Sequence, residues 1–142
     1  MIQRIQSIWM LLAAAAAFFT LKFSFYSGNV LSDDQVTKTY ERVNAQSNIL
    51  ILVLTVGIGI SAIIGIFLYK NRKEQFRICL AGIVASVLNI VLYFLQVKKF
   101  VPGEGSYELY SVLIFLIPFF LILAARGIYK DQKLLKSLDR LR

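Results

Sequence analysis

Residues 48–69 read NILILVLTVGIGISAIIGIFLY and decide the fold class. The segment contains no charged residue and is long enough to cross the hydrocarbon core of a bilayer, which takes about 20 helical residues. The chain lacks the alternating apolar and polar segments that are typical of a membrane β-barrel. The segment therefore predicts a transmembrane helix.

Three more long apolar segments lie at about Ile5–Tyr26, Ile78–Val97 and Leu109–Ala125, and of these the first contains one charged residue, Lys22, near its outer end. The chain has 142 residues, of which 58% are hydrophobic, and this length is enough for one compact domain. We expect an all-α fold, a membrane bundle of four transmembrane helices running up-down-up-down within residues 1–125. An amphipathic basic helix on the cytoplasmic side is expected for residues 126–142.

The distribution of charge predicts the orientation of the bundle. Arg4, the connection 70–77 and the tail from Arg126 together carry 11 basic and 3 acidic residues. The connections 22–47 and 98–108 carry 5 basic and 5 acidic residues, so the net charge of +8 lies on one side. Basic connections stay in the cytoplasm. Both termini are therefore expected there.

The composition argues against several kinds of chemistry. The chain has no histidine, which is the commonest general base and transition-metal ligand, and its single cysteine, Cys79, cannot form an internal disulfide. No ionisable residue lies deep within a span, and ion-coupled transporters usually need one. No nucleotide loop, zinc-ligand set or nucleophile elbow appears. We expect no catalytic residue, metal or cofactor, and we identify no small-molecule substrate.

Small and polar residues recur at helical spacing in the second and third spans. They are Gly57, Ser61 and Gly65 in the second span, and Gly82, Ser86 and Asn89 in the third. Small residues let helices approach closely, so these six are predicted to pack helices together. The Asn89 amide would be costly against lipid and is expected to point into the bundle. In an alternative reading, the face around Asn89 and a bend at Pro118 form the site of a small lipid or solute carrier.

The two outer connections carry turn and capping signals. Ser32 followed by Gln35 resembles a capping box and predicts a helix from Asp33 through Val43. The second connection, residues 97–108, contains Pro102, Gly103 and Gly105 and predicts a turn.

The tail places apolar and basic residues on opposite sides of a helix. The apolar positions are Ile128, Leu134, Leu135, Leu138 and Leu141, and the basic ones are Lys130, Lys133, Lys136 and Arg140. Such a helix can lie on anionic lipids of the inner leaflet. It can also dock onto a partner protein, which Asp131 and Arg142 on the apolar side favour. A third reading is contact with RNA, for instance at a ribosome near a translocon.

The two ends of the chain, MIQRIQSIWMLLA and RGIYKDQKLLKSLDRLR, resemble a family of small four-helix membrane proteins of unknown function from the bacterial phylum Bacteroidota. The resemblance implies an inner-membrane location in a two-membrane bacterium. Gln132 departs from the family's pattern, which has an acidic residue there. The resemblance also marks cytoplasmic positions that are expected to meet or to share a partner. They are Gln3, Arg4, Gln6, Lys130, Asp131, Asp139, Arg140 and Arg142.

These features predict a non-enzymatic accessory or scaffold subunit of an inner-membrane complex, in protein export or envelope biogenesis. The small-residue faces and the cytoplasmic ends would form its contacts. The carrier built around Asn89 and Pro118 remains the alternative.

Overall fold

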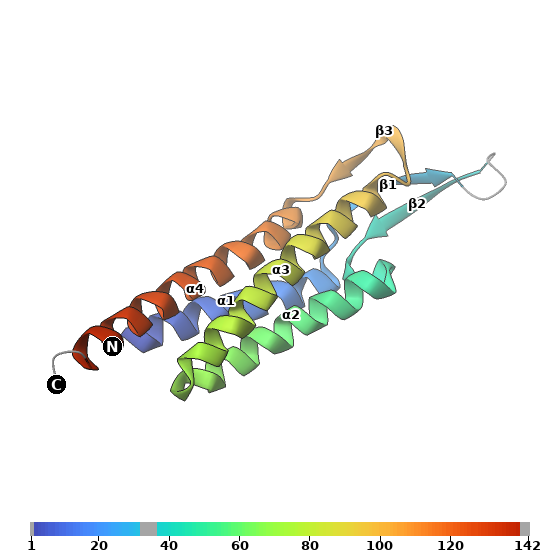
Figure 1. Ribbon diagram of the computed structural model, residues 1–142. Helices are drawn as coiled ribbons and strands as arrows, with labels where there is room; N and C mark the ends of the chain where they lie inside the picture. The colour runs from blue at the N-terminus through green and yellow to red at the C-terminus, as the bar shows by residue number, and fades with distance from the viewer. Residues whose placement is uncertain (1, 32–36, 140–142) are drawn as a thin grey trace.

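The computed structural model describes residues 2–31 and 37–139, which form four long helices and a small sheet (Figure 1). The helices are α1 (Ile2–Lys22), α2 (Ile49–Phe67), α3 (Arg72–Val97) and α4 (Val112–Asp139). All four are long and apolar enough to cross a membrane. The prediction of four such helices is confirmed. The first helix, however, ends at Lys22, before the predicted limit at Tyr26.

The helices pack as a four-cornered bundle in which α1 and α3 each contact α2 and α4. Both ends of the described chain and the α2–α3 connection lie at one end of the bundle, and the sheet lies at the other (Figure 1). We call these the terminal end and the sheet end. Four alanines in the run at 13–17 are buried, namely Ala13, Ala14, Ala16 and Ala17. Their small side chains let α1 approach α2 and α4 closely.

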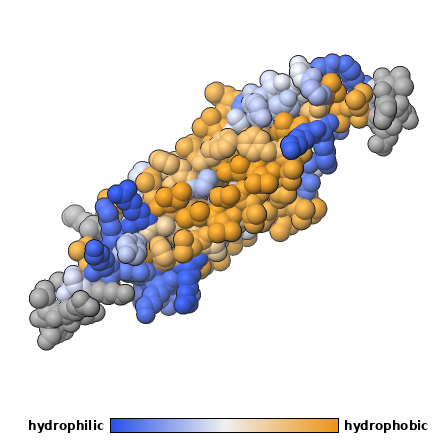
Figure 2. Space-filling view, turned by 45° about the horizontal axis from the view of Figure 1, so that its top comes forward, coloured by the Kyte–Doolittle hydropathy of each residue, from blue (hydrophilic) through white to orange (hydrophobic). Residues whose placement is uncertain are grey.

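Apolar side chains cover the outside of the bundle as well as its core. Figure 2 shows an apolar surface over the middle of the molecule with polar surface gathered at both ends. Phe67 is 75% exposed and Val84 is 62% exposed. Soluble monomers rarely expose continuous apolar surface of this extent. The distribution is compatible with a membrane protein.

The sheet at the other end corrects the all-α prediction. Within the described residues, β1 (Tyr26–Leu31), β2 (Lys38–Val43) and β3 (Phe100–Tyr107) form an antiparallel sheet in the order β2-β1-β3. The predicted helix to Val43 is wrong over residues 38–43, because these residues pair with β1. Residues 32–36, which carry the predicted capping box, lie outside the described part. The second outer connection is mostly strand β3 rather than a simple turn.

Short contacts explain why the outer connections pair. A side chain at Gly28 would bring its Cβ within 2.7 Å of the Gly105 Cα, so glycine lets β1 and β3 cross closely. Pro102, which has no amide hydrogen to donate, lies on an edge strand, where proline is tolerated. Gly103 adopts φ +83°, a left-handed conformation that favours glycine. The Phe25 amide donates to the Val43 carbonyl, which ties the end of α1 to β2.

The charged tail is a continuation of the fourth helix. Helix α4 runs through Pro118 to Asp139, so residues 126–139 form no separate helix. Ile128 is fully buried in the bundle core, whereas Leu134 and Leu135 are about half exposed. The predicted apolar face of the tail therefore divides, with its first member inside the bundle and the next two on the surface.

Candidate functional site

Three side chains from three helices meet at the terminal end. Gln6 Nε2 on α1 donates a hydrogen bond of 2.6 Å to Asp131 Oδ2 on α4. Arg72 Nη1, at the start of α3, lies 3.6 Å from the same oxygen. Gln6 and Asp131 are each only 5% exposed. We call Gln6, Arg72 and Asp131 the terminal polar cluster.

Two neighbouring residues support this cluster. Gln132 Nε2 donates a 2.7 Å hydrogen bond to the Arg72 carbonyl, which joins α4 to the start of α3. An ionised carboxylate at position 132 would have no hydrogen to donate to that carbonyl, so the amide has a defined role. A Cβ at position 127 would lie 2.7 Å from the Gln6 Cγ. Gly127 therefore leaves the room in which Gln6 reaches Asp131.

The cluster brings together some, but not all, of the residues predicted at the cytoplasmic end. Gln6 and Asp131 contact each other in the interior of the bundle. The sequence alone does not indicate this contact, because the two residues are far apart in the chain. Lys130 lies on the surface next to them. The remaining predicted positions fall outside the described side chains or the described chain. They are Gln3, Arg4, Asp139, Arg140 and Arg142.

The outer side of α4 forms a basic groove beside the terminal polar cluster. Lys130, Lys133, Leu134 and Ser137 line a groove of about 320 Å³, which we call the lysine groove. Among the described residues, no ion pair involves either lysine. The one acidic side chain between them in the sequence, Asp131, points inward to Gln6. Folding thus separates the charges of the sequence KDQK, so that its two lysines lie on a face where no described acidic side chain pairs with them.

A second groove runs between α2 and α3. It has a volume of about 320 Å³ and is lined by Val53, Leu54, Gly57, Ile58, Ser61, Ala81, Gly82 and Ala85. We call it the small-residue groove. A Cβ at Gly57 would meet nothing within 4 Å, so this glycine opens onto the outside of the bundle. Ser61 lies across from Gly82, with its Oγ 3.6 Å from the position of an added Cβ.

Gly65 and Ser86, and also Gly82 from the groove wall, make contacts within the bundle. The Cβ position of Gly65 is 3.0 Å from the Met10 Cε, so α1 and α2 are in close contact there. Gly82 and Ser86 are buried on α3, and the Ser86 hydroxyl donates to the Ile83 carbonyl. The six predicted residues are therefore divided between internal packing and the wall of an outward groove.

Asn89 belongs to a polar cluster inside the bundle. Its side chain is 1% exposed, which agrees with its predicted inward orientation, and its Nδ2 donates to Thr55 Oγ1 at 2.9 Å. The Asn89 Oδ1 and the Tyr93 hydroxyl are buried without a hydrogen-bond partner among the described residues. The Tyr93 hydroxyl lies beside Thr20 and Thr55. We call Thr20, Thr55, Asn89 and Tyr93 the interior polar cluster.

Pro118 lies at the same depth in the bundle as the interior polar cluster. The contacts of Phe94 with Phe115 and of Gly82 with Leu121 bracket Asn89 on α3 and Pro118 on α4. Helix α4 continues through the proline, which removes one backbone donor from the helical ladder.

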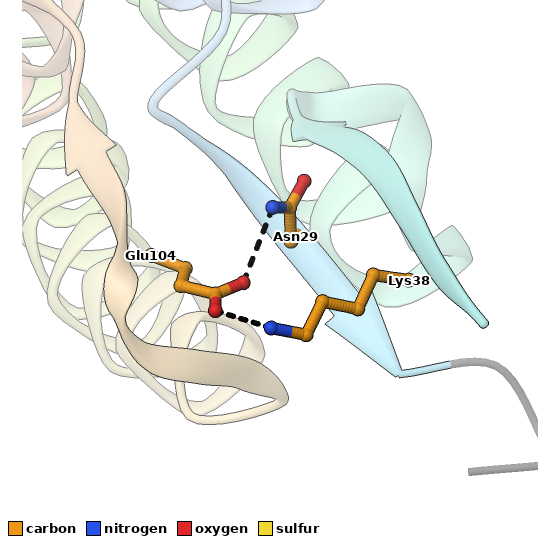
Figure 3. A network of polar contacts seen from close by, with 3 residues as sticks. All are labelled: Asn29, Lys38 and Glu104. Atoms are coloured by element: carbon orange, nitrogen blue, oxygen red, sulfur yellow. Dashed lines mark hydrogen bonds and ion pairs between the residues drawn. The ribbon is translucent and has the colours of Figure 1, made fainter. Parts of the chain in front are cut away.

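At the sheet end, three side chains form a network across all three strands (Figure 3). Glu104 on β3 accepts a 3.2 Å hydrogen bond from Asn29 Nδ2 on β1 and pairs with the Lys38 ammonium on β2. Lys38, and to a smaller extent Asn29, lowers the pKa of Glu104 below its ordinary value. The sequence alone does not indicate these contacts of Glu104, because they exist only once the three strands pair. The network consists of one hydrogen bond and one ion pair that link the three strands, so we assign it a structural role.

The described residues contain no group of three or more histidine, cysteine, aspartate or glutamate side chains that could hold a metal ion.

The chain has four helices that are long and apolar enough to cross a membrane, and a small sheet lies at one end of them. It is therefore of the class of small helical-bundle proteins with four candidate membrane spans. A family model described as "Domain of unknown function (DUF4293)" matches residues 2–141, and the chain belongs to this family. Searches among curated proteins and among solved structures found no match to the chain. The match covers all but the first and last residues of the two terminal segments on which the resemblance rests, and the family's description gives no activity.

Proposed function

We propose that the chain is a four-pass protein of a bacterial inner membrane, with both termini in the cytoplasm and the sheet outside. The apolar surface between two polar ends supports insertion. The excess of basic residues at the terminal end supports the orientation, because basic connections remain in the cytoplasm. The sheet end carries balanced charge, which is easier to translocate.

In this membrane the protein acts as a non-enzymatic accessory or scaffold subunit of a larger complex, in protein export or envelope biogenesis. The observation that carries the proposal is the small-residue groove. Lipid chains are as apolar as leucine, so transmembrane helices associate through close packing of small residues. Gly57 and Ser61 on α2 face the groove one turn apart, as do Ala81 and Ala85 on α3. These walls suit a transmembrane helix of a partner protein.

Filling the groove tests this role. Gly57→Phe introduces a large side chain where a Cβ meets nothing within 4 Å, so the bundle is expected to fold normally. Ile63→Phe is the matched control, because Ile63 is an exposed α2 residue outside the groove. Each variant is purified in mild detergent from native membranes, and its bound proteins are identified by mass spectrometry. We expect a reproducible partner with the wild type and Ile63→Phe, but not with Gly57→Phe. A lone monodisperse monomer for the wild type would contradict the proposal.

A second candidate is a small lipid or solute carrier that uses the inter-helix face around Asn89 and Pro118, where the interior polar cluster lies. It is favoured by the buried Asn89 Oδ1 and Tyr93 hydroxyl, two polar atoms without a partner among the described residues. A bound polar molecule would satisfy both. Extracts of the purified wild type and of Asn89→Leu are compared by mass spectrometry. A small molecule that is retained by the wild type and lost from a normally folded Asn89→Leu supports the carrier, and identical extracts count against it.

A further inference from the structure

We infer that the lysine groove of α4 binds the phosphate headgroup of an anionic phospholipid in the inner leaflet. The inference rests on the membrane placement proposed above and is independent of the accessory role. It assigns to Lys130 and Lys133 a ligand of defined chemistry rather than a general attraction to a charged surface.

The first argument is the separation of charge around α4. Asp131 is buried and held by Gln6 and Arg72, so its carboxylate is directed away from the surface that its two lysine neighbours share. Arg126, one turn before Lys130, is also exposed. The outward face of α4 therefore presents cations in succession, and no described acidic side chain pairs with its two lysines. An ammonium group without a partner is available to a phosphate.

The second argument is the position of the lysine groove along the length of the bundle. The hydrogen bond from Gln132 to the Arg72 carbonyl places the lysine groove level with the α2–α3 connection, where the apolar helix surfaces end. This is the level at which lipid phosphates would lie around a spanning bundle. Tyr129 is 59% exposed and Leu134 is 53% exposed beside the lysines. An aromatic ring with a polar tip is typical of this boundary.

The third argument is the mixed chemistry of the groove. The two lysines supply donors to phosphate oxygens, while Leu134 supplies apolar contact for the glycerol and upper acyl chain. The Ser137 hydroxyl donates to the Leu134 carbonyl, which leaves its oxygen free to accept from a headgroup hydroxyl. Free phosphate would gain nothing from the apolar wall, so the combination favours a lipid. The volume of about 320 Å³ lies at the lower end of the range for ligand sites.

Native mass spectrometry of the full-length protein tests the inference. The purified protein is mixed with equal amounts of phosphatidylglycerol and phosphatidylcholine, and the retained lipids are counted. The test variant carries Lys130→Gln and Lys133→Gln. The matched control carries Lys98→Gln and Lys99→Gln, two exposed lysines at the sheet end. We expect the test variant to retain about tenfold less phosphatidylglycerol than the wild type and the control.

Equal retention by all three proteins, or equal loss in both double variants, would overturn the inference. Preferred binding of a short RNA over phosphatidylglycerol, lost in the same test variant, would also overturn it. Both lysines are exposed, so the unfolding temperatures of the three proteins should agree. Gly57→Phe, which tests the partner helix, should keep the lipid. Failure of the lipid site and failure of the accessory role are therefore distinguishable.

Discussion

Gln6 Nε2 and Asp131 Oδ2 lie 2.6 Å apart, so the first and last helices are joined by a hydrogen bond between residues 125 positions apart in the chain. Both side chains are buried, and Arg72 from a third helix approaches the same carboxylate. Asp131 therefore lies on the inward side of α4, and Lys130 and Lys133 lie on its exposed side, where they line the lysine groove.

Asp131→Ala is expected to destabilise the protein by about 1–3 kcal/mol, because it leaves the buried Gln6 amide without an acceptor and Arg72 without its counter-ion. Asp131→Asn keeps an oxygen for Gln6 and should cost less. Glu74→Ala is the control, since the ion pair of Glu74 with Arg77 is exposed and is worth less than about 1 kcal/mol. Unfolding in detergent measures all three. Equal stability of Asp131→Ala and Glu74→Ala would contradict a structural role for the terminal polar cluster.

Two glycines should respond oppositely to the same substitution. Gly127→Ala places a methyl group 2.7 Å from the Gln6 Cγ, so Gln6 must move and its bond to Asp131 should weaken. Gly57→Ala meets nothing within 4 Å and should be neutral or stabilising, because alanine favours helix. The unfolding temperatures of the two variants give the comparison. An unchanged unfolding temperature for Gly127→Ala would mean that the Gln6 side chain can accommodate the added methyl group and keep its hydrogen bond to Asp131.

Tyr93→Phe removes a buried hydroxyl that has no partner among the described residues, so stability should stay the same or increase. Asn89→Ala, by contrast, breaks the hydrogen bond to Thr55 and leaves a space, and it should be destabilising. Thermal unfolding of both variants checks the difference. A large loss of stability in Tyr93→Phe would contradict this expectation and would show that the hydroxyl is hydrogen-bonded in the folded protein, either to its neighbours Thr20 and Thr55 or to a bound molecule.

The network at the sheet end predicts a pH effect. The folded-state pKa of Glu104 is lowered, chiefly by Lys38, from an ordinary value of 4.5. Its contribution to stability is therefore present above that ordinary pKa and is lost as the pH falls through the lower folded-state value. A titration of the Glu104 carboxyl carbon by NMR should give a pKa below 4.5 in the wild type.

Two variants separate the contributions of Lys38 and Asn29 to the lowered pKa of Glu104. Lys38→Met should return the Glu104 pKa toward 4.5, and Asn29→Ala should do so by a smaller amount. If Asn29→Ala had the larger effect, the ion pair would not be the main cause. A wild-type pKa at or above 4.5 would contradict the contact itself.

The helices could be predicted from the sequence because the length and hydropathy of an apolar helix are local properties of composition. The segment at residues 48–69 identifies a helix by length and hydropathy alone, and α2 lies within it. The sheet could not be predicted in this way. Its strands contain Gly28, Pro102 and Gly103, which are breakers in an average strand, and β1 pairs with β3 across a long separation in the sequence. The signal at Ser32 and Gln35 favoured a helix, and the pairing of β2 with β1 overrides it beyond residue 37.

The residues of the candidate site also differ in how far the sequence predicts them. Lys130 and Lys133 were predicted on a basic face because helical periodicity places them there. The pairing of Gln6 with Asp131 depends on how α1 and α4 meet, which periodicity does not specify. The position of Asp131 on the apolar side of the tail favours a partner protein in the sequence pattern, whereas in the structure Asp131 accepts its hydrogen bond from Gln6 of the same chain. Lys38 and Glu104 carried no comparable signal.

The placement of the sheet outside and the terminal polar cluster inside is tested most directly by cysteine labelling. Cys79 is first replaced by serine, and single cysteines are then introduced as Tyr40→Cys on β2 and Lys133→Cys on α4, both at exposed positions. Spheroplasts with an intact inner membrane are treated with a membrane-impermeant maleimide before and after lysis. We predict that Tyr40→Cys is labelled before lysis and Lys133→Cys only after it. Labelling of Lys133→Cys in intact spheroplasts, or of Tyr40→Cys only after lysis, would contradict this placement.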